Sequence, residues 1–242
     1  MGPLYAIGAI VLTLLVLTWI KVRRYSPFTI RKVVDNILQT EGIFESSKPR
    51  SLDITVVFTN LNDFVTLFGK LGDTAGVALL NEYYSLMTPI VRRHHGFLCQ
   101  YEFDRLFFFF GAIFEQSDSN HAAAAIQTVL DMQGAMDLLN QRLAKRAMPQ
   151  LRMRAGIATA KALVGDIGSE QFCQFTAIGP AVNMAKRLEQ ACKKTDARNL
   201  VSKETRMRAA ESFRFRAIDP AAINGTDRIL DIFEALEGVN GR

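Results

Sequence analysis

Residues 99–111, CQYEFDRLFFFFG, decide the fold because this stretch places a short polar segment between two apolar runs. The runs cover residues 97–101 and 106–110, and the four residues 102–105 separate them, which is the spacing of a β-hairpin. The four consecutive phenylalanines are typical of a core strand rather than of a cofactor-binding segment. This part of the chain therefore predicts two antiparallel strands with Asp104 in their turn.

The segments on both sides of the hairpin complete a recognisable order. Upstream, residues 54–58 (ITVVF) predict a buried strand, and residues 74–93 predict a helix that Gly96 terminates. Downstream, Asn120 can cap a second helix, and residues 151–158 alternate as a strand. Strand, helix, strand, strand, helix, strand is the ferredoxin-like order, so we expect an α+β fold with an antiparallel sheet and helices on one face. Later patterns predict strands over residues 162–167 and 172–178 and a helix over 180–194.

The composition fits one globular domain with an appendage. Of 242 residues, 49% are hydrophobic and 22% charged, which supplies one sizeable core and excludes a disordered polymer. The net charge of +5 includes no basic stripe between aromatic residues, so we expect no nucleic-acid partner. Cys99, Cys173 and Cys192 have no paired spacing and predict buried, reduced thiols.

Residues 4–20 contain no charged side chain and predict one transmembrane helix. Such a helix rises roughly 26 Å, close to the ~30 Å hydrocarbon core of a bilayer. Trp19 and Tyr25 lie where interfacial aromatic residues are common, and a basic cluster follows at residues 21–24. By the positive-inside rule we expect a single-pass protein of the cell (inner) membrane with its folded domain in the cytoplasm. A cleaved signal peptide is disfavoured because no basic residue precedes the run and no small-residue cleavage site follows it.

Between the predicted span and the folded domain lies a connector. Residues 28–44 carry apolar residues at helical spacing, and residues 46–51 read as a loop. The sequence therefore predicts a transmembrane anchor over residues 1–25, an amphipathic connector over 26–50 and a folded domain over 51–242.

Asp104 and a polar pair in the second half are the candidates for chemistry. A carboxylate in a hairpin turn is placed to hold a divalent cation, although aspartate is also common in turns for structural reasons. Asn183 and Arg187 are four residues apart in a predicted helix and therefore share a face. An amide and a guanidinium arranged in this way can hold a sugar and a phosphate, and a solvated polar face is the plainer alternative.

Three ordered blocks resemble the class III adenylyl and guanylyl cyclases. They are residues 56–64 (VVFTNLNDF), 99–111 and 156–189 (GIATAKALVGDIGSEQFCQFTAIGPAVNMAKRLE), and the resemblance covers nearly all of residues 51–236. The segments LNEYY at 80–84 and ILDIFEAL at 229–236 are also similar to that family. The resemblance implies the class III nucleotide cyclase fold.

The resemblance also implies a mechanism across a dimer. One subunit supplies two aspartates for two metal ions, Mg²⁺ or Mn²⁺, and the other supplies purine-reading residues and an Asn/Arg pair that stabilises the pentavalent phosphate. The ribose 3′ oxygen attacks the α-phosphate, and pyrophosphate leaves. We therefore expect a homodimer or a heterodimer with another cyclase domain, and a nucleoside triphosphate as a possible ligand.

Part of the family's site is retained in this sequence. Asp104 corresponds to the second metal-holding aspartate, and Asn183 and Arg187 correspond to the transition-state pair. Thr176 lies at a base-reading position, where threonine resembles one subgroup of bacterial adenylyl cyclases.

Other positions depart from the family pattern. Asn60 replaces the first metal-holding aspartate, and Gln100 replaces a base-reading lysine. Phe103 replaces a glycine before the second aspartate, Phe172 an arginine, and Pro180 an aspartate or asparagine. These changes predict a weakened metal site.

Four hypotheses follow for the function. The first is a catalytically weak or inactive cyclase homologue that acts as a regulatory or dimerising partner. The second is one half of a heterodimer, in which Asn183 and Arg187 complete the site of a partner, although Gln100 counts against it. The third is an active adenylyl or guanylyl cyclase, in which Glu102 or Asp63 substitutes as a metal ligand. The fourth is a purely structural role.

Overall fold

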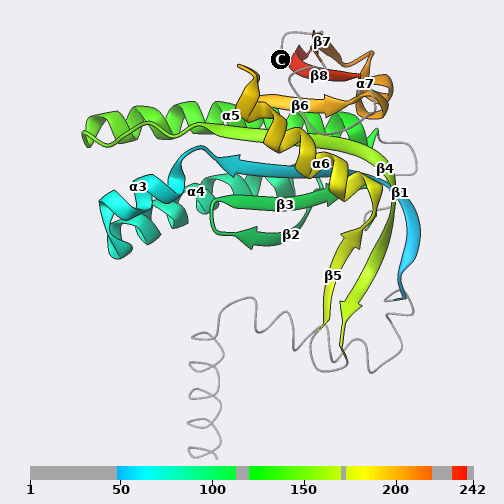
Figure 1. Ribbon diagram of the computed structural model, residues 1–242, viewed down its shortest axis with the longest axis horizontal. Helices are drawn as coiled ribbons and strands as arrows, with labels where there is room; N and C mark the ends of the chain where they lie inside the picture. The colour runs from blue at the N-terminus through cyan, green and yellow to red at the C-terminus, as the bar shows by residue number, and fades with distance from the viewer. Residues whose placement is uncertain (1–47, 113–119, 170–172, 220–230, 239–242) are drawn as a thin grey trace, which may run out of the picture. The chain divides into compact units, whose positions relative to one another are not determined.

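The computed structural model describes residues 48–112, 120–169, 173–219 and 231–238 (Figure 1). The chain divides into two units, Met1–Lys48 and Pro49–Arg242, and the fold below is that of the second. The predicted membrane span at residues 4–20 and the connector helix at 28–44 lie outside the described residues. Among the helices of the described ranges we find no candidate for a bilayer span.

The hairpin predicted around Asp104 is present. β2 (Phe97–Glu102) and β3 (Arg105–Phe110) pair antiparallel. β1 (Arg50–Leu61) lies beside β3, and β4 (Met153–Gly168) lies on the other side of β1, again antiparallel. The remaining elements are α3 (Phe64–Leu71), α4 (Asp73–Arg93), α5 (His121–Lys145), β5 (Cys173–Ile178), α6 (Pro180–Ala191), the 3-10 helix η1 (Cys192–Lys194), β6 (Asn199–Ser202), α7 (Lys203–Ala209), β7 (Phe213–Ile218) and β8 (Ile232–Gly238).

The ferredoxin-like prediction is confirmed for the first half of the sheet. The strand order is β2-β3-β1-β4-β6-β8-β7, with β5 paired to the end of β4. The prediction of a wholly antiparallel sheet is wrong beyond β4, because β6 pairs parallel to β4. In Figure 1 the hairpin of β4 and β5 extends away from the rest of the sheet.

The two strands predicted at residues 151–158 and 162–167 are one continuous strand, β4. Its residues pair with β1 without interruption from Met153 to Val164, so the polar residues between the two predicted runs stay in the ladder. The last six residues of β4 pair with β5. Because β4 has partners along its whole length, no turn forms where the apolar pattern weakens.

Helices cover both faces of the sheet. Val57 and Phe108 point to the face that packs against α4 and α5, whereas Val56 and Phe109 point to the opposite core with α6. This alternation is what the period of two in a strand requires. The prediction of helices on one face holds for α4 and α5, and α6 closes the other face.

Glycine at position 156 allows α6 to lie directly on β4. A Cβ atom there would come within 2.1 Å of the carbonyl oxygen of Ala185 and 2.3 Å of the backbone nitrogen of Glu189. Any larger side chain would therefore push the helix away from the sheet. This close contact places Glu189 directly against the start of β4, next to the candidate site.

Two predicted helix boundaries are confirmed in atomic detail. The Asn120 side chain accepts hydrogen bonds from the backbone nitrogens of Ala122 and Ala123, each at 3.2 Å, and starts α5. After α4, the nitrogen of Gly96 donates to the carbonyl oxygen of Val91 at 2.9 Å.

Candidate functional site

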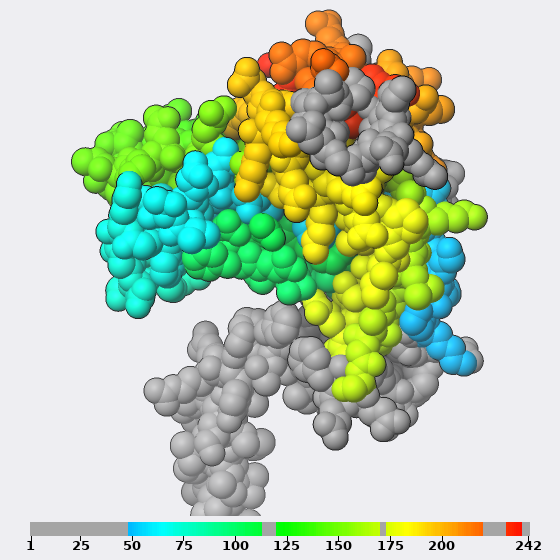
Figure 2. All heavy atoms as spheres, in the orientation of Figure 1, coloured from blue at the N-terminus to red at the C-terminus, as the bar shows by residue number. Residues whose placement is uncertain are grey.

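A cleft of about 610 Å³ opens where β1 ends and α3 begins. Its other walls are the turn between β2 and β3, the start of β4 and the segment after α6. In Figure 2 the cyan start of α3 and the yellow end of α6 lie on one face of the molecule. The charged residues that line the cleft are the basic Arg105, Arg152, Arg154, Lys193 and Arg198 and the acidic Asp63, Asp104 and Asp196.

The structure brings Asn60 and Asp104 together in this cleft, as the sequence predicts. Asn60 is the penultimate residue of β1, and the backbone nitrogen of the next residue, Leu61, donates to the carbonyl oxygen of Asp104 at 2.8 Å. The Asp104 carboxylate lies 3.8 Å from Nε of Arg105. The two positions expected to hold metal ions are thus neighbours, and only one of them, Asp104, carries a carboxylate.

Arg154 is a residue of the candidate site that the sequence analysis missed. It lies opposite Asn60 in β4 and is only 7% exposed. Its Nη2 donates to Oδ1 of Asn60 at 2.6 Å, and its Nε donates to Oε1 of Glu189 at 3.3 Å. The signal available in the sequence was an arginine two residues before Gly156, within the strand predicted over residues 151–158. A buried arginine needs polar partners, and here they come from two other elements.

Glu189 is a buried carboxylate on the inner side of α6. Burial raises the pKa of Glu189 above its ordinary value, and the nearby guanidinium groups of Arg154 and Arg105 oppose that shift. The ion pair with Arg154 therefore offsets part of the cost of burying both charges.

The residues of the cleft do not fit a two-metal centre. Mg²⁺ and Mn²⁺ prefer charged oxygen ligands, but the one oxygen of the Asn60 side chain already accepts from Arg154. The remaining side-chain group of Asn60 is an NH₂ donor, which cannot ligate a cation. Asn62 adds a buried oxygen without a hydrogen-bond partner, but this oxygen carries no charge. Within the described ranges, no three His, Cys, Asp or Glu side chains are grouped to hold a metal ion.

Of the two rescuing ligands considered from the sequence, one lies at the cleft. Asp63 lines it, next to the first turn of α3, whereas Glu102 is not among its lining residues. Asp63 therefore brings a second carboxylate to the same cleft as Asp104, at a different position from Asn60.

Asn183 and Arg187 lie on the exposed face of α6, as the spacing predicts. Neither residue lines the cleft that contains Asp104. Pro180 is the first residue of the helix, where a missing backbone N–H is tolerated. The structure thus keeps the polar pair together and separates it from Asp104 within one chain.

Gln100 of β2 and Thr176 of β5 lie outside the cleft, on strands that do not pair with each other in the sheet. The Sγ of Cys99, the residue before Gln100, donates to Oγ1 of Thr176 at 3.1 Å, so β2 and β5 meet here. Gln100 itself is exposed, beside an irregularity in the pairing of β2 with β3.

The prediction of buried cysteines holds for Cys192, which is buried. Cys99 is half-buried instead. Cys173 is exposed, because it starts β5 at the end of the projecting hairpin.

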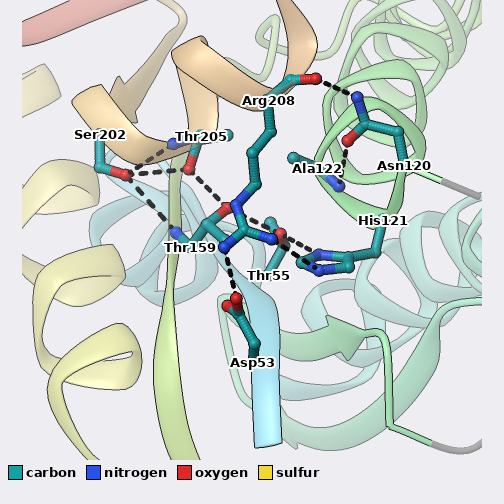
Figure 3. Close-up of polar contacts among 9 residues, drawn as sticks. All are labelled: Asp53, Thr55, Asn120, His121, Ala122, Thr159, Ser202, Thr205 and Arg208. Atoms are coloured by element: carbon teal, nitrogen blue, oxygen red, sulfur yellow. Dashed lines mark hydrogen bonds and ion pairs between the residues drawn. The ribbon is translucent and has the colours of Figure 1, made fainter.

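A second polar cluster, which no sequence pattern indicated, crosses the sheet through hydroxyl groups (Figure 3). Oγ1 of Thr55 lies 2.7 Å from Oγ1 of Thr159, which lies 2.9 Å from Oγ1 of Thr205. Ser202 continues the chain at 2.9 Å from Thr205. These bonds join β1, β4 and the start of α7 in the buried interior.

His121 connects this hydroxyl chain to surface charges. Its Nδ1 lies 2.7 Å from Oγ1 of Thr55, and its Nε2 lies 3.4 Å from Nη1 of Arg208. Because arginine can only donate, Nε2 accepts and the neutral ring carries its proton on Nδ1. Arg208 also donates to the carboxylate of Asp53. Burial and Arg208 lower the pKa of His121 below its ordinary value, and Asp53 opposes the shift.

Comparisons with known proteins agree with this fold. A family model of the adenylate and guanylate cyclase catalytic domain matches residues 47–233. Adenylate cyclase 1 of Rhizobium meliloti (strain 1021) is 30% identical over 184 residues, which are 76% of this chain and 27% of that protein. The terminal-differentiation-specific adenylate cyclase of Dictyostelium discoideum is 28% identical over 189 residues, 76% of this chain and 9% of that protein. The chain thus spans about a quarter or less of the length of these relatives.

Among solved structures, the crystal structure of the adenylyl cyclase CyaB from P. aeruginosa is similar to this chain. The TM-score is 0.74 and the sequence identity 27%, covering 81% of this chain and 99% of that one.

Proposed function

Because the chain belongs to the family of adenylate and guanylate cyclase catalytic domains, we propose that it is a membrane-anchored cyclase homologue of weak or absent activity. Its role is that of a regulatory or dimerising partner in cyclic-nucleotide signalling. The observation that carries the proposal is the contact between Arg154 and Asn60, because it places a guanidinium cation against the neutral side-chain oxygen that stands in for a metal-holding carboxylate.

The expected loss of rate is large. Removing one charge-stabilising group from an active site costs on the order of 10²-fold in rate, or about 3 kcal/mol. Asn60 and Gln100 each lack a charge that active members of the family have at that position. The losses do not simply add, because the groups of one site act as a unit. Even partial addition leaves a homodimer with very slow turnover.

The geometry supports a role in dimers. Asp104 and the pair Asn183 and Arg187 lie apart in one chain, so a site that contains all three needs two chains. The projecting hairpin offers an apolar surface for such contact. Leu163 and Ile178 lie opposite each other in β4 and β5 and are 44% and 53% exposed. The dimer is either a homodimer or a heterodimer with another cyclase domain.

The proposal of a membrane anchor is based on the amino-acid sequence. The uncharged run at residues 4–20, followed by the basic cluster at residues 21–24, supports a single pass through the cell (inner) membrane with the cyclase-like domain in the cytoplasm.

Two alternatives to this proposal retain catalytic activity. As half of a heterodimer, the exposed Asn183 and Arg187 would complete the site of a partner that supplies both metal-holding aspartates. As an active cyclase, the chain would use Asp63 with Asp104, since both line the cleft. The curated relatives compared above are named adenylate cyclases, so ATP is the first substrate to test and GTP the second.

The test is an activity measurement on the full chain purified in detergent, with ATP or GTP and Mn²⁺ or Mg²⁺. We expect little or no cyclic nucleotide. Robust turnover that disappears in Asp104→Ala and persists in Asp196→Ala, a second acid of the cleft, would overturn the proposal. For the heterodimer, a cyclase that co-purifies with the chain should lose activity in Asn183→Ala; if no partner's activity depends on Asn183, that alternative fails.

A further inference from the structure

The contacts of His121 join three elements that are far apart in the sequence (Figure 3). His121 is the first residue of α5, and it lies against Thr55 of β1 and Arg208 near the end of α7. We propose that His121, Arg208 and Asp53 form a proton-operated latch, which holds the end of α7 and the start of α5 against the first residues of β1 and opens when His121 takes up a proton. None of the three lines the cleft at the end of β1, so the latch is independent of the proposed function.

The side of the ring that faces Thr55 is a fixed anchor. Nδ1 carries the proton of the neutral ring and donates to Oγ1 of Thr55, a completely buried residue, at 2.7 Å. The hydroxyl of Thr55 can then donate in turn to Thr159, 2.7 Å away. A second proton goes to Nε2 and leaves the N–H at Nδ1 unchanged. Protonation therefore acts on the Arg208 side of the ring alone.

Arg208 ties the end of α7 to both neighbouring elements. Its guanidinium donates to the carboxylate of Asp53 in β1. Its backbone carbonyl oxygen accepts from Nδ2 of Asn120, whose Oδ1 caps α5. α7 is only seven residues long, and so short a helix depends on tertiary contacts for its stability. A displacement of Arg208 therefore loosens α7 from the starts of β1 and α5 together.

The charges around His121 oppose a second proton on its ring. Arg208 of α7 faces Nε2, and the positive end of the α5 dipole disfavours a cation at the first residue of the helix. Asp53 of β1 favours the charged ring, but this carboxylate already pairs with Arg208 and lies opposite Lys161 of β4. Gly111, just after β3, lies close to the ring and brings no charge. Burial and Arg208 accordingly lower the pKa of His121.

A proton on Nε2 converts the contact with Arg208 from attraction to repulsion. The acceptor becomes a donor, and two cations then lie 3.4 Å apart. Solvent reaches this side of the latch, because the side chains of Arg208 and Asp53 are 43% and 40% exposed. Since histidine ordinarily titrates at a pKa of 6.5 and the latch lowers this value, the latch is closed at neutral pH and opens in mild acid.

The experiment is amide hydrogen exchange, followed by mass spectrometry, on the full chain in detergent at about pH 7.5 and about pH 5.5, one unit on either side of the ordinary pKa of histidine. Protection factors remove the intrinsic pH dependence of exchange. Peptides from α7 and from the first turn of α5 report on the latch. Peptides from α4, which contains no latch residue, report on global opening.

Two variants and one matched control separate the latch from other groups. His121→Gln supplies an amide that can accept from Arg208 and donate to Thr55 but does not titrate. Arg208→Gln keeps a donor and removes the cation. The control is His94→Gln, which changes a histidine hydrogen-bonded to Asp131 and remote from the latch in its contacts.

We expect the protection of α7 to be about tenfold lower at the acidic pH, because one pH unit below the ordinary pKa corresponds to a tenfold change in the opening equilibrium. α4 should change much less. His121→Gln should keep α7 protected at both pH values, Arg208→Gln should diminish the difference, and His94→Gln should leave it unchanged.

The latch is refuted if the protection of α7 does not depend on pH, or if α4 loses protection to the same extent. It is refuted equally if His121→Gln retains the difference or if His94→Gln removes it. Should His121→Gln fail to fold, Arg208→Gln decides, because an undiminished difference in that variant contradicts a repulsion between the two cations.

Discussion

Arg154 of β4 donates a hydrogen bond of 2.6 Å to the side-chain oxygen of Asn60 in β1, at the position where the family resemblance places a metal-holding aspartate. In this contact the guanidinium of Arg154 is the donor and the amide oxygen of Asn60 is the acceptor. The guanidinium of Arg154 lies against the neutral oxygen of Asn60, and the NH₂ group of Asn60 is a donor that cannot ligate a cation.

An aspartate at position 60 should therefore restore metal binding. A carboxylate has a second oxygen, so one can accept from Arg154 while the other ligates a cation. We expect Asn60→Asp to raise Mn²⁺-dependent cyclase turnover on the order of 10²-fold. The matched control is Asn62→Asp, which adds the same charge to the same cleft and should leave turnover low. Equal effects of the two variants would show that charge alone, rather than position, matters.

Removing Arg154 should destabilise the fold through its buried partner. Arg154→Met leaves Glu189 buried without its cation, and breaking a buried pair costs about 3–5 kcal/mol. The double variant Arg154→Met/Glu189→Gln should recover most of that loss, because no isolated charge remains. Chemical denaturation of the purified chains measures both values. A double variant as unstable as the single one would contradict this account.

The same pair predicts how stability depends on pH. The pKa of Glu189 is raised in the folded chain, so the folded state binds its proton more tightly than the unfolded state. The contribution of this group to stability is present below the unfolded pKa of 4.5 and is lost as pH rises through the folded pKa. Because Arg154 opposes the shift, Arg154→Met should widen this pH window. Unfolding free energies between pH 4 and pH 8 test it, and Glu189→Gln should abolish the effect.

His121 should make the stability of the fold depend on pH in the opposite direction from Glu189. Its pKa is lowered in the folded chain, first by burial and then by Arg208, so the unfolded state takes up the proton first as pH falls. Stability should fall as pH drops from the ordinary value of 6.5 through the folded pKa. The slope should disappear in His121→Gln and shrink in Arg208→Met, which removes a neighbouring cation. A slope unchanged in both variants would assign it to other groups.

Phe103 should hold α3 in place despite an unfavourable backbone. It adopts φ +54°, where non-glycine residues are strained by roughly 1 kcal/mol, and its ring packs edge-on against Phe64 and Phe68 at 5.5 and 5.2 Å. Each ring pair contributes about 0.5–1.5 kcal/mol. Phe103→Gly relieves the strain but loses both ring contacts, whereas Phe103→Ala keeps the strain and loses the same two contacts. We expect stability in the order Phe, Gly, Ala, with faster hydrogen exchange in α3.

The hairpin, α4 and α5 could be predicted because their signals are local. Alternating or helical apolar spacing, the cap at Asn120 and the stop at Gly96 each act within a few residues. The placement of Asp104 next to Asn60 followed from the same local reasoning together with the family resemblance. α3 was missed because eight residues give too short a pattern, and Gly69 interrupts it.

The contacts that decide the chemistry of the cleft could not be predicted from the sequence. Arg154 and Glu189 are 35 residues apart, and their pairing depends on α6 lying directly against Gly156. No local pattern contains that approach, because it is set by packing between a helix and a strand. The chain of hydroxyl groups from Thr55 to Ser202 is likewise tertiary, and serines and threonines carry no signal of burial by themselves.

β4 joins the candidate site to the projecting hairpin. Arg154 lies in the cleft near the start of β4. Leu163, where the pairing with β5 begins, is nine residues further on, or about 30 Å at the rise of a strand. Both belong to one uninterrupted ladder with β1. The proposed dimer contact at the hairpin and the Arg154–Asn60 contact in the cleft therefore share one continuous strand.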